Sequence, residues 1–349
     1  MRKVLLVKLA SLGDVLATSP FPMLIKKHHT NLSLHHLVME HCRVVTEHNP
    51  WLDKQIVIEF MPSGNRWVDL ARAAKLVFRL RAEKYDTAFV FHRNLFFQVV
   101  CWLGGIREIY GFSSRLNPFY KKHMTYRFDV NRTEQECDLL RMGGLDIPNV
   151  ESLEFHPAAS ELSDEIAQKL PDQFIACNPG GGNPHAPADN RMWPIEKYAA
   201  LINASSLPFV ILGHGAADAE RVNELTKMVD SARMVSLVNN TSFSDTALVL
   251  QRATLYVGND SSLMFLAAAM GISTVGLYGP TQSVAANPVG KKQYAIIGNA
   301  ECAPCYNPYD GVSGKMYACT NNICMQDIDV EVVLNRINTL IKECGAENK

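Results

Sequence analysis

Short apolar runs alternate with amphipathic segments along almost the whole chain, and the cycle restarts after residue 150. Strands separated by helices are typical of βα units, which build a parallel sheet. The sequence therefore predicts an α/β fold with two doubly wound domains. In the first half, we expect strands at residues 3–9, 32–38, 55–60, 86–92 and 108–112. In the second half, we expect strands at residues 174–180, 208–213, 233–238, 255–260, 273–279 and 294–299.

A chain of 349 residues is too long for one typical core, which also favours two domains. Residues 145–160 lack clear periodicity, so we place a linker there. Ligands of doubly wound sheets bind beyond the carboxyl ends of the strands, and we expect the two domains to face a central cleft. The predicted boundaries are 1–155 for the first domain, 156–328 for the second and 329–349 for a C-terminal helix. The clearest further helices are expected at residues 65–84, 194–206, 217–230, 244–253 and 262–271.

Charge and composition exclude several classes of protein. The formal net charge is −1, so no global field favours nucleic acid, and we expect no nucleic-acid partner. No apolar stretch reaches the length of a membrane span. The first apolar run indicates a strand rather than a signal peptide. With nine cysteines and no secretory signal, we expect a cytoplasmic protein with mostly reduced thiols.

Three consecutive glycines, Gly180, Gly181 and Gly182, follow an apolar run in the second half. Such a loop lets backbone amides approach an anion closely. Arg191 and a helix start come shortly afterwards, and the combination suits a diphosphate group. The glycines alone would fit a solvent-exposed flexible loop equally well.

Polar residues follow two further strands of the second half. Asp260, Ser261 and Ser262 stand directly before a helix, where they either cap it or accompany phosphate oxygens at its N-terminus. Gly279 and Thr281 follow the next expected strand and should lie at the same edge of the sheet. We assign these five residues to the same nucleotide-diphosphate site.

Two carboxylates have both a chemical and a structural interpretation. Asp14 follows Gly13 at the first strand-to-helix turn, where it either takes a proton from a substrate hydroxyl or complements the helix dipole. Glu220 follows another strand and either accepts hydrogen bonds from ribose hydroxyls or is a solvated residue on a helix face, which its spacing alone favours.

Candidate acceptor contacts lie at strand ends of the first half. They are Lys8, His92, Arg93 and Asn94. Residues 65–84 form a basic amphipathic segment with Arg72, Lys75, Arg79 and Arg81. We interpret that segment as a surface helix with its apolar stripe on the sheet. The alternative is a face that meets an anionic glycolipid at the inner membrane.

Four stretches together carry a resemblance to a known family. They are "KLASLGDVLATSP", "NPGGG…RMWPIEKYAAL", "GNDSSLMFLAAAMGISTVGLYGPT" and "CAPC…CMQDI". The chain resembles the ADP-heptose:lipopolysaccharide heptosyltransferases of glycosyltransferase family nine. The resemblance implies the GT-B fold, which has two Rossmann-like domains, and an inverting transfer of heptose from ADP-heptose to a lipopolysaccharide core or related glycan.

The resemblance also implies roles for individual residues. The N-terminal domain would hold the acceptor, with Asp14 as the general base. The C-terminal domain would hold the nucleotide sugar, with Arg191 at the diphosphate, Glu220 at the ribose and Asp260 ahead of the helix at the sugar site. No cofactor or divalent ion would be required for catalysis. Contact with the inner face of the cytoplasmic membrane would be peripheral.

Two departures from the family pattern keep other functions open. Ser262 stands where family members usually have Gly, and Phe265 stands where many heptose enzymes have His. The alternatives are another nucleotide sugar, a protein acceptor, a sugar-nucleotide epimerase or a non-catalytic nucleotide-sugar binder. A dinucleotide oxidoreductase is disfavoured because no G-x-G-x-x-G follows the first strand.

Four cysteines are spaced as C-x2-C and C-x4-C with thirteen residues between the pairs. This spacing is typical of a tetrahedral thiolate site. Some protein-modifying members of the resembled family carry a four-cysteine iron site in this region, so we expect a structural zinc or iron. The alternatives are free packed thiols and disulfides, of which a reducing compartment disfavours the second. The cysteines are Cys302, Cys305, Cys319 and Cys324.

Overall fold

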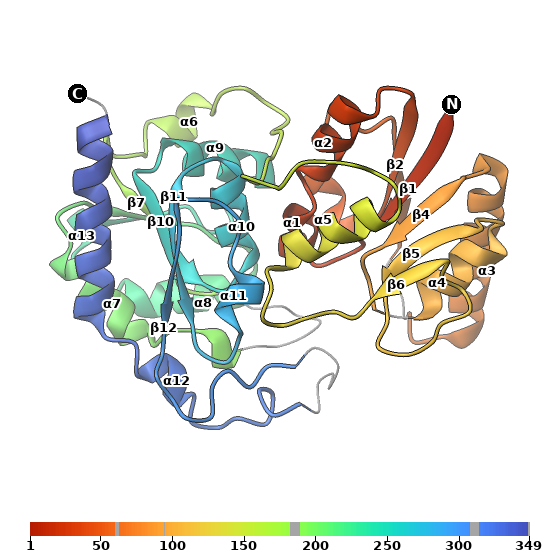
Figure 1. Cartoon of the computed structure of the whole chain (residues 1–349). Helices are drawn as coiled ribbons and strands as arrows, with labels where there is room; N and C mark the ends of the chain where they lie inside the picture. The colour runs from red at the N-terminus through yellow and green to blue at the C-terminus, as the bar shows by residue number, and fades with distance from the viewer. Residues whose placement is uncertain (60–62, 94, 182–188, 308–313, 348–349) are drawn as a thin grey trace. The chain divides into compact units, whose positions relative to one another are not determined.

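A computed structural model describes residues 1–59, 63–93, 95–181, 189–307 and 314–347. Two compact units, Met1–Glu151 and Ser152–Lys349, make up the chain (Figure 1). The division falls after residue 151, whereas the sequence places the boundary after residue 155. The chain between α5 and α6 has neither helix nor strand, as expected of the predicted linker.

The first unit is a six-stranded parallel sheet with helices on both faces. Its strand order is β3-β2-β1-β4-β5-β6. The strands are β1 (Arg2–Val7), β2 (Leu32–Met39), β3 (Lys54–Ile58), β4 (Thr87–Val90), β5 (Glu108–Phe112) and β6 (Lys122–Met124). The helices are α1 (Leu12–Ala17), α2 (Phe21–His28), α3 (Arg66–Glu83), α4 (Leu95–Leu103) and α5 (Arg132–Met142), with a 3-10 turn at Glu40–Val45.

Side chains of β1 alternate between two cores, which is why this run is apolar throughout. Leu5 and Val7 belong to the core shared with α3 and α4. Val4 and Leu6 belong to the core shared with α2 and α5. The central strand is therefore fixed from both sides, and the turn that follows it starts from a rigid base.

The second unit repeats this architecture with strand order β12-β11-β10-β7-β8-β9, again parallel. Its strands are β7 (Ile175–Asn178), β8 (Phe209–Ile211), β9 (Met234–Ser236), β10 (Leu255–Asn259), β11 (Ser273–Tyr278) and β12 (Gln293–Ile297). Its helices are α6 (Asp164–Ala167), α7 (Ile195–Ala204), α8 (Ala216–Leu225), α9 (Phe243–Arg252), α10 (Ser262–Ala269), α11 (Ser283–Ala286), α12 (Ile323–Gln326) and α13 (Val330–Glu347), and 3-10 turns lie at Asp189–Arg191 and Ser231–Arg233.

Helices cover both faces of this second sheet. Val275 and Leu277 of β11 share a core with α7 and α13. Gly276, between them, faces the other way against Met264 of α10. The helix expected at the C-terminus is thus part of the second unit. None of the described helices has both the length and the apolar character of a membrane span.

Candidate functional site

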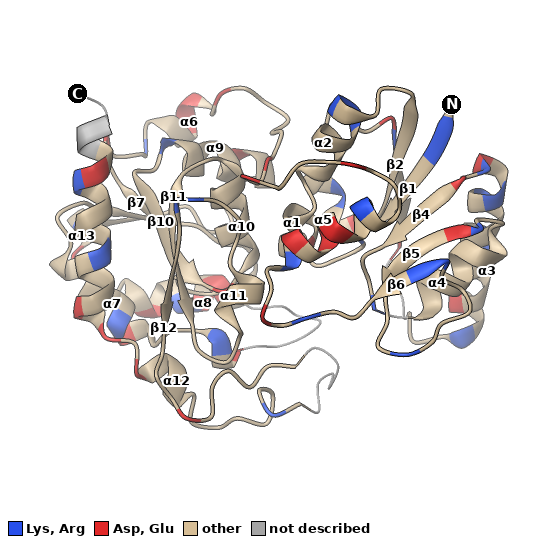
Figure 2. Ribbon diagram, in the orientation of Figure 1, with Lys and Arg blue, Asp and Glu red and all other residues tan. Residues whose placement is uncertain are grey.

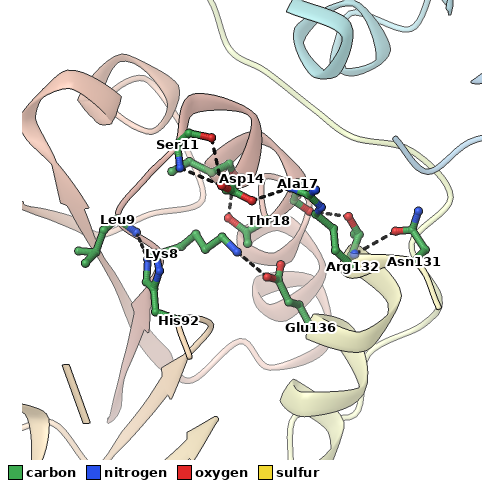
Figure 3. Close-up of polar contacts among 12 residues, drawn as sticks. Lys8, Leu9, Ser11, Asp14, Ala17, Thr18, His92, Asn131, Arg132 and Glu136 are labelled. Carbon is green, nitrogen blue, oxygen red and sulfur yellow. Dashed lines mark hydrogen bonds and ion pairs between the residues drawn. The ribbon is translucent and has the colours of Figure 1, made fainter. Parts of the chain in front are cut away.

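Asp14 lies in the first turn of α1, just beyond the carboxyl end of β1 (Figure 3). Its Oδ2 accepts hydrogen bonds from the backbone N (2.9 Å) and the Oγ (3.0 Å) of Ser11. Its Oδ1 accepts from Nη1 of Arg132 at 2.5 Å, and the Asp14 side chain is 33% exposed. Burial alone would raise the pKa of Asp14, but the charges of Arg132 and Lys8 and the Ser11 bonds hold it well below its usual range. Asp14 is therefore ionised and partly open to solvent.

Lys8 does not point into open solvent. It forms a buried ion pair with Glu136, which lies on α5, the helix that also carries Arg132. Its Nζ lies 2.6 Å from Oε1 of Glu136, and the two side chains are 7% and 1% exposed. Burial raises the pKa of Glu136, while Lys8 opposes that shift. Arg132 and Glu136 are four residues apart on α5 and therefore lie on the same face of that helix. This face pairs with both charged residues of the β1–α1 turn, Asp14 and Lys8.

The end of β4 supports the same turn. The backbone N–H of Leu9 donates to Nε2 of His92 at 2.7 Å. Burial, assisted by the charge of Lys8, lowers the pKa of His92 to about 3, so its imidazole is neutral and free to accept this bond. The guanidinium of Arg93 lies 4.4 Å from the centre of the Tyr126 ring. Asn94 lies outside the described residues.

In the second unit, the glycine loop after β7 packs against a carboxylate on α8. Oδ1 of Asp218 accepts from the N–H of Gly181 at 3.2 Å, and Oδ2 accepts from the N–H of His214 at 3.0 Å. A Cβ on Gly180 would lie 2.0 Å from Asp218 Oδ1. A Cβ on Gly181 would lie 2.8 Å from Ser261 Cβ, and Gly181 has a positive φ of 102°. Gly182 lies outside the described residues.

Asn259, the last residue of β10, fixes the start of this loop. Its Nδ2 donates to the carbonyl oxygens of Pro179 and Gly180, at 3.0 and 2.8 Å. Its Oδ1 accepts from the backbone N of Trp193 at 2.9 Å and from the Tyr198 hydroxyl at 3.0 Å. The glycine loop is therefore tied to the strand end that carries the predicted site.

Some buried polar atoms at this edge of the sheet have no hydrogen-bond partner within the described part of the chain. Among them are Oδ1 of Asn178, which ends β7, and Oγ1 of Thr281, which follows β11. An unpaired buried acceptor or hydroxyl costs free energy, so such atoms indicate a place where a ligand or water completes the bonding.

Arg191 and Asp260, which the sequence assigned to the nucleotide-diphosphate site, lie beside each other. Arg191 Nη1 is 3.3 Å from Asp260 Oδ2, and its guanidinium lies 5.9 Å from the Tyr306 ring centre. Ser261 is the N-cap of α10 and Ser262 its first residue.

Two other residues predicted for this site have surroundings that differ from those of Arg191 and Asp260. Glu220 is exposed on α8. Gly279 lies against α12, because a Cβ there would be 2.7 Å from Cys324 Sγ. Close packing is thus a sufficient reason for glycine at position 279.

The predicted four-cysteine metal site is not supported. All nine cysteines are free thiols, and the described residues contain no group of three or more His, Cys, Asp or Glu side chains able to hold a metal ion. The four thiols are still neighbours: burial and then the nearby thiols raise the pKa of Cys305 and of Cys324. Cys319 instead donates to Oδ1 of Asn321 at 3.5 Å. Spacing brings the thiols near one another without converging their sulfur atoms on a point.

Comparison with known families then identifies the chain. The model of glycosyltransferase family 9 (heptosyltransferase) matches residues 73–312. The chain belongs to this family. It is therefore a glycosyltransferase, and the predicted enzyme class is confirmed.

Curated relatives and solved structures agree with the family. Lipooligosaccharide heptosyltransferase 2 of Campylobacter jejuni is 24% identical over 233 residues, which cover 64% of this chain and 69% of that one. Lipooligosaccharide heptosyltransferase 2 of Haemophilus influenzae is 24% identical over 314 residues, covering 84% and 88%.

The solved structures confirm the predicted α/β, GT-B fold class. The family 9 glycosyltransferase of Veillonella parvula superposes with a TM-score of 0.79 at 20% identity, covering 98% of each chain. The Escherichia coli ADP-heptose lps heptosyltransferase II superposes with a TM-score of 0.72 at 18% identity, covering 98% and 99%.

Three residues with central roles in these sites were missed by the sequence reasoning. Arg132 and Glu136 are 118 and 128 positions from their partners, and no local pattern predicts such a pairing. Asp218 lies two residues before the predicted Glu220 on the same helix, so the sequence marked the element but not this side chain.

Proposed function

We propose that this enzyme transfers heptose from ADP-heptose to a lipopolysaccharide core or related glycan, with inversion and with Asp14 as the general base. The observation that carries the proposal is the ionised, solvent-accessible Asp14 at the carboxyl end of β1 in a member of this family. A carboxylate in that state can accept the proton that the acceptor hydroxyl must lose.

The proposed reaction is a single displacement. The acceptor oxygen bonds to the anomeric carbon, the bond from that carbon to the diphosphate breaks, and ADP leaves with the electron pair. Because the pKa of Asp14 is low, it is a weak base, and the proton moves to it late, once bonding to carbon has made the hydroxyl strongly acidic. Donor positioning is assigned to the predicted residues of the second unit. They are Gly180, Gly181, Gly182, Arg191, Glu220, Asp260, Ser261, Ser262, Gly279 and Thr281.

Fixed groups of the chain suit the departing diphosphate. Arg191 supplies a cation, and the N-terminus of α10 supplies backbone N–H donors. We therefore propose that transfer needs no divalent ion. Turnover that survives a chelator supports this point, and turnover restored only by added Mg²⁺ or Mn²⁺ contradicts it.

One residue, Phe265, favours a second candidate function. Phe265 is 2% exposed in α10 and offers no polar group where many heptose enzymes have His. Another nucleotide sugar, or a protein acceptor, is the alternative that this residue favours. A donor screen by calorimetry, comparing ADP-heptose with other ADP- and UDP-sugars, separates the two.

The deciding experiment measures donor binding and ADP release on the same variant. Asp14→Asn should keep the affinity for ADP-heptose but lose release of ADP in the presence of acceptor. Near wild-type kcat in Asp14→Asn would overturn the assignment of the base. Donor binding without ADP release in the wild-type chain would instead indicate a non-catalytic nucleotide-sugar binder.

A glycolipid acceptor is held in a membrane. We therefore propose that the enzyme acts in the cytoplasm as a peripheral protein at the inner face of the cytoplasmic membrane. Lys8, His92, Arg93 and Asn94 remain the proposed acceptor-side residues, although Lys8 and His92 act through the turn they support.

A further inference from the structure

Helix α3 has two apolar faces, of which only one is used by the core. Leu76 and Leu80 are buried against the sheet, as the sequence predicts for a surface helix. Trp67, Leu70 and Phe78 lie on the opposite side and are 79%, 61% and 72% exposed. Residues three and eleven positions apart share one side of a helix, so these three form a second stripe. The core gives no reason for large apolar residues there.

Helix α4 carries further exposed apolar side chains. It covers the same face of the sheet as α3 and packs beside that helix. It has no charged residue, and its outward side chains are a third to a half exposed. Large apolar side chains exposed together on neighbouring helices indicate a binding role in a monomeric protein. The α3–α4 face consists of Trp67, Leu70, Phe78, Leu95, Phe96, Trp102 and Leu103.

Basic side chains accompany this face. α3 contains five basic and two acidic residues, although the whole chain has a formal net charge of −1. Figure 2 shows Lys and Arg on α3, of which Arg66, Lys75, Arg79 and Arg81 are exposed. The guanidinium of Arg107 lies 5.8 Å from the centre of the Trp102 ring. The face thus combines apolar and aromatic side chains with positive charge.

We propose that the α3–α4 face docks on a lipid bilayer with anionic headgroups. Exposed tryptophans suit the boundary between headgroups and acyl chains, where one end of the ring is apolar and the other is wet. The leucines and Phe78 enter the acyl region, and the basic residues contact the anionic headgroups. A second copy of the chain fits less well, because two basic faces would repel each other. The proposal rests on the proposed function only in that a glycolipid acceptor lies in such a membrane.

The test is flotation of the full chain with lipid vesicles that contain neither donor nor acceptor. Vesicles of phosphatidylglycerol and phosphatidylethanolamine should carry the protein, and vesicles of phosphatidylcholine should carry far less. Binding should fall as salt rises, because counterions screen the headgroups. The double variant Trp67→Ser, Phe78→Ser should lower the partition coefficient about ten-fold or more. Lys75→Gln and Arg81→Gln should each lower it about five-fold.

A matched control replaces two exposed apolar residues of the second unit by serine. Ile323 and Val332 are 49% and 53% exposed, and Ile323→Ser with Val332→Ser should float like the wild type. Thermal melts check that every variant is folded. Equal flotation of Trp67→Ser, Phe78→Ser and the wild type would overturn the proposal. So would a wild-type dimer in sedimentation that this double variant dissociates, because the face would then join two copies.

The result of the flotation test can be distinguished from the result of the test of the proposed function. ADP release is measured with a water-soluble, deacylated acceptor, for which no vesicle is needed. Normal release without flotation removes the membrane proposal alone. Flotation without release, under any donor and acceptor, removes the transferase proposal alone.

Discussion

Arg132 on α5 places its Nη1 2.5 Å from Oδ1 of Asp14 on α1, joining two residues that are 118 positions apart (Figure 3). The pair keeps the Asp14 carboxylate oriented and lowers its pKa. Arg132 therefore controls both the geometry and the basicity of the proposed base. Substitution of Arg132 should therefore change the pH dependence of turnover as well as the rate of turnover.

Arg132→Gln tests this relationship. The wild-type pKa of Asp14 is well below the ordinary range, so wild-type kcat/KM should stay flat as pH falls towards 4. Without the guanidinium, the pKa should return towards its ordinary value of about 4, and kcat/KM should fall below that pH as the carboxylate protonates. The pH profile of kcat/KM measures this shift.

The matched control for that profile is Arg127→Gln. Arg127 is an exposed arginine of the same unit that pairs with Asp129 rather than with the proposed base. Its variant should reproduce the wild-type profile. If Arg132→Gln shows the same flat acid limb as the wild type, Arg132 does not tune Asp14.

The Lys8–Glu136 pair predicts a loss of stability with a specific rescue. Lys8→Met leaves Glu136 buried and unpaired, which should lower the free energy of unfolding by about 3–5 kcal/mol. The double variant Lys8→Met, Glu136→Leu removes both charges and should recover most of that loss. Urea unfolding of the three proteins measures it.

An exposed pair provides the comparison for the buried one. Lys169 and Glu165 lie on the surface of the second unit, and Lys169→Met should leave the urea midpoint unchanged. A double variant as unstable as Lys8→Met would show that the pair is needed for packing and not only for charge balance.

The pattern of apolar runs was sufficient to predict most of the fold. Each of the eleven predicted strands is present, because buried parallel strands are nearly continuous apolar runs. The missed strand β6 has only three residues, Lys122–Met124, and none is buried. The missed helix α5 is polar on much of its surface, and buried positions such as Gln135 and Glu136 hide its periodicity.

The positions of the candidate-site residues were predictable where these residues follow strands and not where they come from helices that pack across the sheet. Asp14 and Asp260 come soon after apolar runs, which place them near strand ends, whereas Arg191 lies in the 3-10 turn before α7. Arg132 reaches Asp14 only because α5 packs beside α1, a tertiary contact without a local signal. The cysteine spacing was misleading because sequence spacing does not fix where the thiol sulfur atoms point.

His92 predicts a pH dependence of stability. Its folded pKa is about 3, below the ordinary value of about 6.5, so the unfolded state binds a proton more readily than the folded state between these values. The stability that His92 contributes is therefore complete above about pH 6.5 and is lost as pH falls towards 3, by about 1.4 kcal/mol per unit. His92→Gln retains an acceptor for Leu9 N–H and should flatten this slope in urea unfolding at pH 4.5 to 7. His28→Gln, an exposed histidine, should keep the wild-type slope.

Substitutions of Asp218 and Glu220 should distinguish the ordering of the glycine loop from recognition of the donor. Asp218→Ala removes the acceptor for the N–H groups of Gly181 and His214, so it should lower the melting temperature of the protein without ligand. Glu220→Ala removes an exposed side chain, so it should leave that melting temperature unchanged while weakening ADP-heptose binding through the proposed ribose contact. Thermal melts with and without ADP-heptose measure both effects. A stable Glu220→Ala with undiminished donor affinity would remove Glu220 from the site, and a normal melt of Asp218→Ala would show that the glycine loop is ordered without Asp218.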